Sequence, residues 1–501
     1  MGADKQTDKV FFLPGNHLYP AQLLNAYRDT TIVMIEDAAI CQRRPYHQQK
    51  LALMLSAMRE HAVALRSAGH RVEYFPLAAE QTLTSALKQV CASLGTRTLC
   101  TFEVYDQSLT RLLTNFCNTH ELEWHTAGNP AFLTRSADFA GYANGKKQLR
   151  MGDFYKKQRL GLNILVDRDQ NPIGGQWSFD AENRKKLPRT QPLPTLNQIE
   201  HSDVTASTIL EVADRFSSHP GDANGLWVPT TRAGAIAWLQ TFIEQRLLGF
   251  GTYEDAITTR SAVLFHSALS PMLNLGLLTP SEIVAAVLEA AESQGIPLND
   301  VEGIIRQVIG WREFMHGVYD QFGSTMRRRN TRGQQRTLSR HWHDGNTGIP
   351  PLDAAIKHQR DLGWNHHINR LMVIANLMNL CEIEPDQVYE YFMTYYLDAY
   401  DWVMVPNVYG MGLNSDGGIF ATKPYICGSN YLLKMSDFKR GDWCDVVDGL
   451  YWRFISNNME ELRKNARLSV FASGLNRLAD EKKERIFSAA EHFLERCTVV
   501  E

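Results

Sequence analysis

The chain has 501 residues, of which 44% are hydrophobic and 21% charged, with a formal net charge of −3. This balance excludes a general electrostatic attraction for nucleic acid or membranes, and no apolar run approaches the roughly 18–20 residues of a membrane span. The polar N-terminus predicts no signal peptide. The eight cysteines contain no C-x-x-C pair, which argues against a disulfide framework or zinc finger and favours the reducing cytoplasm.

The first 135 residues alternate predicted strands and helices. Apolar runs at 9–13, 30–37, 71–77, 96–106 and 122–127 predict strands, and 47–70 has helical periodicity up to a stop signal at Gly69. This alternation predicts an α/β domain with a doubly wound, Rossmann-like parallel sheet. Such sheets bind ligands beyond the carboxyl ends of their strands, which here means near residues 14–16 and 36–37. No GxGxxG follows the first strand, so a dinucleotide fingerprint is absent.

The rest of the chain predicts a connection and a helical domain. Residues 136–205 are first basic and then rich in Gly, Pro and Asn, which is typical of an extended linker. From 206 to 501 nearly every segment predicts helix. We therefore expect an α/β domain (1–135), a linker (136–205) and a large all-α domain (206–501).

Polar residues occur on apolar helices of the expected helical domain. His366 and Arg370 are four residues apart, and His367 aligns with Arg370 at a three-residue spacing. A buried arginine needs an anionic partner, and Asp398 and Asp401 are candidates. A structural ion pair with satisfied core histidines explains the same pattern.

A second cluster of hydrogen-bonding groups surrounds a predicted helix start in residues 251–278. Hydroxyl groups and free backbone N–H groups at such a place favour a phosphate site, although ordinary capping explains them about as well. The residues are Tyr253, His266, Ser267, Ser270 and Asn274.

Two further segments are candidates for binding. Six arginines between 327 and 340 suit phosphate contacts, with a solvated basic loop as the alternative reading. Residues 405–437 predict a long Gly-rich loop without secondary structure, and such loops are usually functional.

Several segments together resemble a known family. EGIIRQVIGWREFMHGVY, HHINRLM, DAYDWVMVPNVYGM, DGGIFATKPY and GSNYLLKMSD are similar to the bacterial (6-4) photolyases that carry an iron–sulfur cluster, a branch of the cryptochrome/photolyase superfamily. The likeness covers nearly the whole chain in the family's order. It implies an α/β domain that can hold an antenna chromophore and a helical domain that holds a U-shaped FAD.

The resemblance also implies roles for particular residues. Expected FAD contacts are Tyr253, His266, Ser267, Ser270, Asn274, Glu302, Arg306, Trp311, Arg370, Asp398 and Asn407. Expected catalytic residues are His367 and His366, with Tyr425 and Tyr431 beside the lesion. Expected DNA contacts are Arg184, Arg327, Arg328, Arg329, Arg332 and Lys423.

The implied reaction is light-dependent DNA repair on UV-damaged DNA by a chain we expect to be a monomer. Photoexcited reduced FAD passes an electron to a flipped-out (6-4) pyrimidine photoproduct, and His367 donates a proton. The alternatives are a cryptochrome-like blue-light photoreceptor without repair activity, a photolyase for another lesion, and a flavoprotein without a light role.

The chain departs from the family at the iron–sulfur ligands. Only Cys444, in what reads as a polar loop, matches one of four ligating cysteines; the other positions fall at Pro350 or Pro351, Lys439 and near Asp442. Because one thiolate cannot hold a cluster that needs four ligands, we predict no iron–sulfur cluster and no other metal.

Two other departures concern electron transfer and the antenna. The family's aromatic relay keeps Trp342, but Tyr391 and Phe392 stand where the family has Trp and Tyr. Asn16 and Ile40 replace carboxylates that the relatives place near a lumazine antenna, so a lumazine-type antenna is uncertain.

Overall fold

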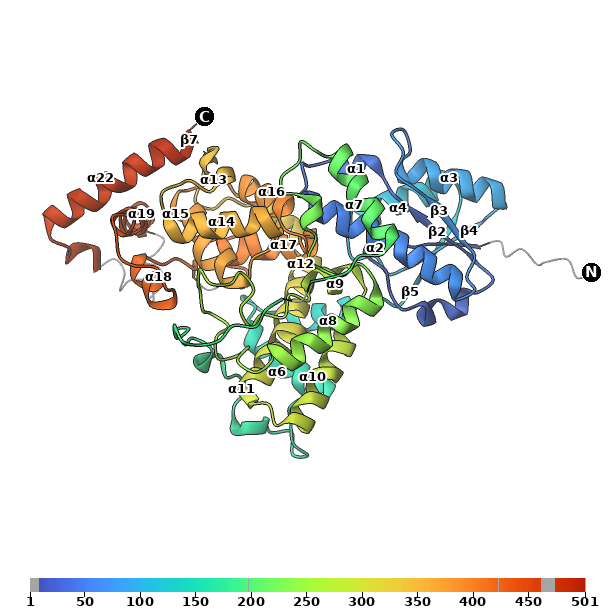
Figure 1. Cartoon of the computed structure of the whole chain (residues 1–501), viewed down its shortest axis with the longest axis horizontal. Coiled ribbons are helices and arrows are strands. Elements are labelled where there is room, and N and C mark those ends of the chain that lie inside the picture. Colours follow the sequence, from blue (N-terminus) through green and yellow to red (C-terminus); the bar gives the residue numbers. More distant parts are fainter. Residues whose placement is uncertain (1–8, 197, 422, 461–473, 501) are drawn as a thin grey trace, which may run out of the picture.

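The computed structural model describes residues 9–196, 198–421, 423–460 and 474–500. Its N-terminal part is a five-stranded parallel sheet in the order β3-β2-β1-β4-β5, at one end of the molecule in Figure 1. Phe11 lies opposite Ile32 on one side and Cys100 on the other. The strands are β1 (Lys9–Phe12), β2 (Thr31–Ile35), β3 (Val72–Phe75), β4 (Thr98–Phe102) and β5 (Glu123–Ala127). All five predicted strands and the doubly wound order are confirmed.

Side chains of alternate strand residues enter two different cores, as a parallel sheet covered on both faces requires. Phe11 and Ile32 pack in the core that includes helix α2 (Gln48–Ser67). Val10 and Val33 pack with α3 (Leu83–Leu94) and α4 (Gln107–Thr119). Helix α2 ends as predicted, because Gly69 has a φ of 86° that only glycine adopts easily.

The strand order reverses between β1 and β4, so the topological switch point lies there. Aromatic side chains fill the loops after these strands: the rings of His17 and Tyr105 are 5.1 Å apart, as are those of Tyr19 and Phe102. Asn16 donates to the Tyr105 hydroxyl over 3.0 Å.

Near residues 36–37, where the sequence predicts a ligand site, both carboxylates have structural partners, and the ligand site there stays a prediction. Glu36 accepts two hydrogen bonds from Arg59, at 2.7 and 2.8 Å, and another from the backbone of Leu77. Asp37 caps helix α1 (Ala38–Gln42). Ile40, on α1, is exposed.

Residues from 206 onward are mainly helical, as predicted, and occupy the other end and the base of the molecule in Figure 1. The expectation of an extended linker over 136–205 is wrong for its first part, which forms two helices, α5 (Ser136–Ala143) and α6 (Met151–Leu162). Helix α7 (Asp203–Arg215) returns to the sheet domain and packs on α2, where Arg59 pairs with Glu211 at 2.7 Å. The other principal helices are α8 (Arg232–Gln245), α9 (Ser270–Leu275), α10 (Pro280–Gln294), α11 (Leu298–Ile305), α12 (Glu313–Arg327), α13 (His341–Asp344), α14 (Pro350–Leu362), α15 (Asn376–Leu380), α16 (Pro385–Tyr395), α17 (Asp401–Val405), α18 (Ser429–Met435), α19 (Trp443–Asn457) and α22 (Asp480–Cys497).

Three helices contain π-helical segments, which are η5 (Arg306–Arg312), η6 (Asn369–Ala375) and η7 (Pro406–Gly412). Because η7 and α18 lie within 405–437, the prediction that this segment lacks secondary structure is wrong. A small antiparallel sheet of β6 (Arg336–Leu338) and β7 (Thr498–Val500) was also not foreseen. No helix among the described residues combines the length and apolarity needed to cross a bilayer.

Candidate functional site

The centre of the candidate site is the ion pair between Arg370 and Asp398. Arg370 donates to both carboxylate oxygens, at 2.8 and 3.1 Å, and through Nε to the Asn365 carbonyl at 2.7 Å. The two side chains are only 12% and 7% exposed. Asp398 is therefore the partner of Arg370, while Asp401 pairs with Arg327 at 2.8 Å.

The segment 266–275 supports Asp398. The Ser270 hydroxyl donates to the carboxylate over 2.5 Å, and Asn274 donates to the Asp398 backbone carbonyl at 2.9 Å. Burial alone would raise the pKa of Asp398, but Arg370 and Ser270 outweigh it and lower that pKa. Ser270, the first residue of the six-residue helix α9, thus positions a carboxylate.

The histidines lie directly beside this pair. The rings of His266 and His366 are stacked 4.5 Å apart and nearly parallel. Burial, and then His266 and His367, lower the pKa of His366. The side chain of His367 is exposed, yet the surrounding protein and Arg370 lower its pKa to about 4. His367 is therefore an accessible imidazole that is neutral at neutral pH.

Each of the three π-helical segments carries a residue expected to contact FAD: Arg306 on η5, Arg370 on η6 and Asn407 on η7. Such segments are rare and frequently occur at functional sites. Asn407 donates to the Val403 carbonyl at 2.7 Å, and η7 packs against η6. Trp311, also on η5, packs toward Phe314 and does not join the charged residues.

Arg306 lies among carboxylates. It contacts Glu302, Glu254 and Asp180 at 3.3 Å each, and only 4% of its side chain is exposed. Glu302 also accepts from the backbone of Phe179 at 3.0 Å, which holds the linker on the helical domain. Burial raises the pKa of Glu254 to about 7, although Arg306 opposes this shift.

Tyr253 and Ser267 lie in the loops that precede α9. Tyr253 stacks on Phe265 with ring centroids 5.4 Å apart, and the Ser267 carbonyl accepts from Trp238 at 2.9 Å. Leu264 and Ala268, on either side of these positions, adopt left-handed φ values of 51° and 50°. Such backbone strain in non-glycine residues concentrates at functional sites.

Tyr425 and Tyr431 lie on a segment that is bonded to the η6–α15 helix. Asn376 donates to the Cys427 carbonyl at 3.3 Å and accepts from the Cys427 backbone at 3.0 Å. Burial and then Asp255 raise the pKa of Tyr431. Arg184, which ion-pairs with Asp180 and lies 3.7 Å from Asp255, approaches from the linker.

The arginine run divides into internal and exposed members. Arg327 pairs with Asp401, and Arg332 donates to the carbonyls of Leu413 and Asn414 at 2.8 and 3.1 Å, so both have structural roles that the sequence did not reveal. Arg328 and Arg329 are exposed, although Arg329 also donates to the Asp416 carbonyl at 2.8 Å. Lys423 is exposed.

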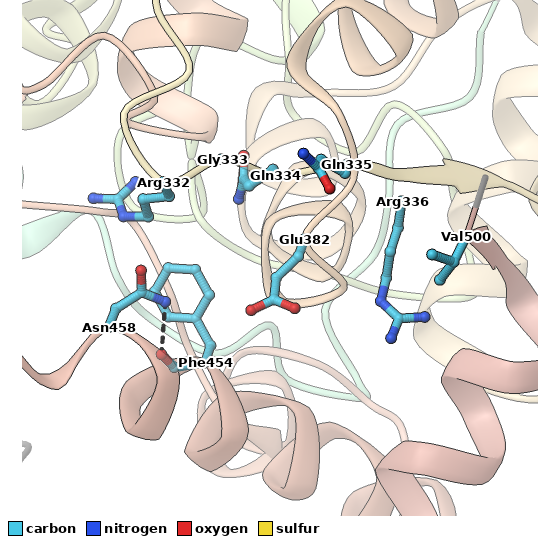
Figure 2. A pocket seen from close by; sticks show the side chains of 9 residues that line it. All are labelled: Arg332, Gly333, Gln334, Gln335, Arg336, Glu382, Phe454, Asn458 and Val500. Carbon is cyan, nitrogen blue, oxygen red and sulfur yellow. Dashed lines mark hydrogen bonds between the residues drawn. The ribbon is translucent and has the colours of Figure 1, made fainter.

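Figure 2 shows a pocket beside this run, between the strand β6 region and α19. Its charged groups are of both signs, since Glu382 lies between Arg332 and Arg336, and Glu382 already pairs with Arg453 at 2.7 Å. None of the residues expected to contact FAD lines it. The remaining lining residues are Gly333, Gln334, Gln335, Phe454, Asn458 and Val500.

Of the two predicted electron-transfer residues, Tyr391 belongs to a larger group of rings, whereas the buried Trp342 indole donates to the Cys497 carbonyl at 2.9 Å. Tyr391 donates to the Trp342 carbonyl at 2.9 Å, and its ring centroid is 4.7 Å from that of Tyr395. Tyr395 in turn hydrogen-bonds His343, which is exposed, at 2.9 Å.

These rings continue inward to the ion pair. Phe392 lies 6.3 Å from Tyr391 and 5.3 Å from Tyr396, measured between ring centroids. The guanidinium of Arg370 lies 4.0 Å from the centre of the Tyr396 ring. An unbroken series of aromatic contacts therefore joins the site to an exposed histidine.

Residues 47–50 of the α/β domain form hydrogen bonds to backbone carbonyls of the helical domain on both sides of Asp398, which the sequence did not predict. Lys50 donates to the carbonyls of Met393 and Ala399 at 2.9 and 2.8 Å, just before and after Asp398. His47 bonds the carbonyls of Thr394 and Arg360 at 2.8 and 2.7 Å, and Gln49 bonds that of Asp361 at 2.9 Å. Burial lowers the pKa of Lys50 to about 7. The only sequence signal was a lysine among the buried positions of an apolar helix.

Cys444 lies in helix α19 and is 2% exposed, so the expectation of a polar loop is wrong and its packing role is supported. Pro350 and Pro351 form the start of α14, which needs no donor there. All eight cysteines are free and buried. No group of three or more potential metal ligands occurs among the residues the structure describes.

The residues present fit a polar cofactor. Buried polar atoms without hydrogen-bond partners gather at the site: His266 Nε2, both ring nitrogens of His366, and Trp364 Nε1. Native proteins rarely leave such atoms unpaired, so their concentration indicates a ligand that supplies donors and acceptors. Arg370 and Asp398 would face the flavin ring, and the 266–270 loop its ribityl and phosphate groups.

Comparisons with known proteins agree with this geometry. Residues 11–227 match the family described as deoxyribodipyrimidine photo-lyase-related protein, and residues 305–426 match the FAD binding domain of DNA photolyase. The chain is 31% identical over 483 residues to the (6-4) photolyase of Agrobacterium fabrum, covering 94% of this chain and 95% of that one. It is 46% identical over 126 residues to the uncharacterized protein R855 of Acanthamoeba polyphaga mimivirus, which spans 25% of this chain and 99% of that protein.

Solved structures show the same fold. A bacterial class III photolyase from Agrobacterium tumefaciens aligns with a TM-score of 0.59 at 18% identity, covering 99% of both chains. The cryptochrome of Synechocystis aligns with a TM-score of 0.57 at 15% identity, covering 99% of this chain and all of that one. The full-length identity to a photolyase, together with the match to its FAD binding domain, means that this chain belongs to the photolyase/cryptochrome family.

Proposed function

We propose that this protein is a light-dependent DNA repair lyase of the (6-4) photolyase type. The observation that carries the proposal is the buried Arg370–Asp398 pair with His366 and an accessible His367 directly beside it. This arrangement lies in a chain that matches a (6-4) photolyase over nearly its full length. FAD supplies light-driven electron transfer when bound.

The protein's own residues orient the partners and move protons. Arg370, held by Asp398 and Asn365, provides a fixed positive charge beside a negatively charged reduced flavin. His367 is the candidate proton donor to the lesion. Burial and Arg370 lower its pKa in the flavin-free protein, and the negative charges of bound DNA and flavin would raise that pKa toward the range in which it can donate near neutral pH.

Damaged DNA is the proposed partner. Tyr425 and Tyr431 offer partly buried rings against which an extruded base can stack. Arg328, Arg329 and Lys423 are the exposed cations proposed to contact phosphates. Arg184 is also proposed to contact DNA, although it is ion-paired with Asp180.

Repair itself is the decisive experiment. Reduced protein is incubated with an oligonucleotide that carries one (6-4) lesion, illuminated with blue light, and assayed for restored thymine by chromatography. We expect light-dependent restoration, reduced about 10²- to 10⁴-fold in His367→Ala, which retains its flavin. No restoration by the flavin-loaded wild type would refute the proposal.

A photoreceptor without repair is the second candidate, because the fold is shared with a cryptochrome. The affinities for UV-irradiated and undamaged oligonucleotide, measured at the same stated salt concentration, separate the two candidates. A repair enzyme should bind the irradiated oligonucleotide more tightly, whereas a photoreceptor without repair activity should bind both equally.

The remaining assignments are also proposals. We propose that the chain holds no iron–sulfur cluster, acts as a monomer and resides in the cytoplasm; iron and sulfide near four per chain would refute the first of these. A lumazine-type antenna stays a prediction, to be tested by the absorbance of chromophores released on denaturation.

A further inference from the structure

Three arginines are almost completely buried, and they differ in how their charge is satisfied; Arg306 has the carboxylate partners described above. Arg159 is 0% exposed, and its guanidinium donates to the carbonyls of Ile164 and Trp177 at 3.3 and 3.0 Å and also to that of Leu165. Arg246 is 2% exposed, yet its Nε and Nη2 atoms have no hydrogen-bond partner. Within the described part of the chain no carboxylate lies within ion-pair distance of it. A buried cation requires compensation, so Arg246 lacks an anion.

The position of Arg246 indicates where that anion belongs. Arg246 follows α8, and its guanidinium lies 5.0 Å from the centre of the Trp238 ring. Trp238 donates to the Ser267 carbonyl at 2.9 Å. The ring of Phe250, four residues after Arg246, lies 6.1 Å from that of His266. Arg246 therefore packs against the 266–270 loop from the side of α8.

Arg246 also affects the pKa of His266. Burial, followed by His367 and Arg246, lowers the pKa of His266 to about 3, so this imidazole stays neutral. Burial likewise lowers the pKa of Arg246 itself to about 10. The arginine remains charged at neutral pH, and a neighbouring anion would stabilise it.

We propose that Arg246 binds the diphosphate of FAD and makes the site select a phosphorylated flavin. The proposal rests on the flavin assignment made above and extends it to a residue outside the segments quoted for the resemblance and outside the two matched family regions. A guanidinium presents parallel N–H groups that match phosphate oxygens, and here it is held ready without a competing carboxylate.

The test uses full-length, flavin-free protein and its Arg246→Met variant. FAD and riboflavin are titrated into both and followed by quenching of flavin fluorescence. We expect Arg246→Met to bind FAD roughly 10- to 150-fold more weakly, the range of a charged hydrogen bond, with riboflavin affinity unchanged. Arg246→Lys should recover part of the loss.

Thermal melting supplies a readout that does not depend on flavin. Inorganic pyrophosphate should raise the melting temperature of the wild type but not of Arg246→Met. Without any ligand, Arg246→Met should melt at the same or a higher temperature, because it removes an uncompensated charge. The matched control Arg159→Met should melt lower, because it leaves carbonyls unpaired, and should keep the wild-type ratio of FAD to riboflavin affinity.

The outcomes separate the two proposals. FAD affinity of Arg246→Met within twofold of wild type, or an equal loss of FAD and riboflavin, would overturn the role of Arg246 while leaving the flavin assignment in place. A wild-type chain that binds neither flavin nor pyrophosphate would overturn both.

Discussion

Replacing Asp398 with asparagine tests whether the Arg370–Asp398 pair organises the site. The carboxylate accepts two bonds from Arg370 and one from Ser270, whereas an asparagine amide offers one oxygen and turns its NH₂ toward another group. Arg370, whose side chain is only 12% exposed, would remain buried without a counter-charge. Breaking a buried ion pair in this way costs about 3–5 kcal/mol.

The assay is urea unfolding of flavin-free protein, followed by tryptophan fluorescence, for Asp398→Asn, Arg370→Met and the double variant. We expect the double variant to lose less free energy of unfolding than the two single variants lose together, because removing both charges leaves neither unpaired. FAD retention should fall in parallel.

The exposed pair Arg135–Asp138 is a matched control, since its two bonds of 2.8 and 3.0 Å have nearly the same geometry but its side chains are 82% and 48% exposed. Asp138→Asn should leave stability unchanged. A loss below about 1 kcal/mol for Asp398→Asn, the range of a surface pair, would refute the reasoning.

Three other predictions follow from the site. In flavin-free protein the His367 imidazole should titrate near pH 4 by NMR; because this pKa lies below its unfolded value of 6.5, the residue's contribution to stability should be lost as the pH falls from 6.5 toward 4. Binding of damaged DNA should raise that pKa, and an unchanged titration would exclude close phosphates. Tyr395→Phe should slow photoreduction of the flavin as strongly as Tyr391→Phe, measured by absorbance under blue light, since both rings belong to one series of contacts; wild-type rates in Tyr395→Phe would place the electron path elsewhere. Arg328→Ala with Arg329→Ala should weaken binding of all oligonucleotides and reduce the salt dependence by up to about two phosphate contacts, measured by fluorescence anisotropy; an unchanged salt slope would remove these arginines from the interface.

The strands and the main helices followed from the sequence because apolar periodicity determines them locally. The pairing of Arg370 with Asp398 was one of two expected possibilities, and only the packing of α17 on α12 decided that Asp401 goes to Arg327. The π-helical segments could not be predicted, because their single extra residue per turn leaves no mark in a hydrophobic pattern. Periodicity also could not show that Arg332 donates to the backbone carbonyls of Leu413 and Asn414, since a run of charged residues has the same sequence whether it faces inward or outward.

The hydrogen bonds from His47, Gln49 and Lys50 have a consequence for how this molecule can be divided. They satisfy five carbonyls of the helical domain, at Arg360, Asp361, Met393, Thr394 and Ala399. A helical domain expressed alone would expose those carbonyls and would lose the hydrogen bonds that fix the backbone on both sides of Asp398. The α/β domain therefore cannot be exchanged independently of the helical domain. A chimera that carries the α/β domain of a relative should keep its cofactor only when residues 47–50 and the segments that they bind come from the same protein.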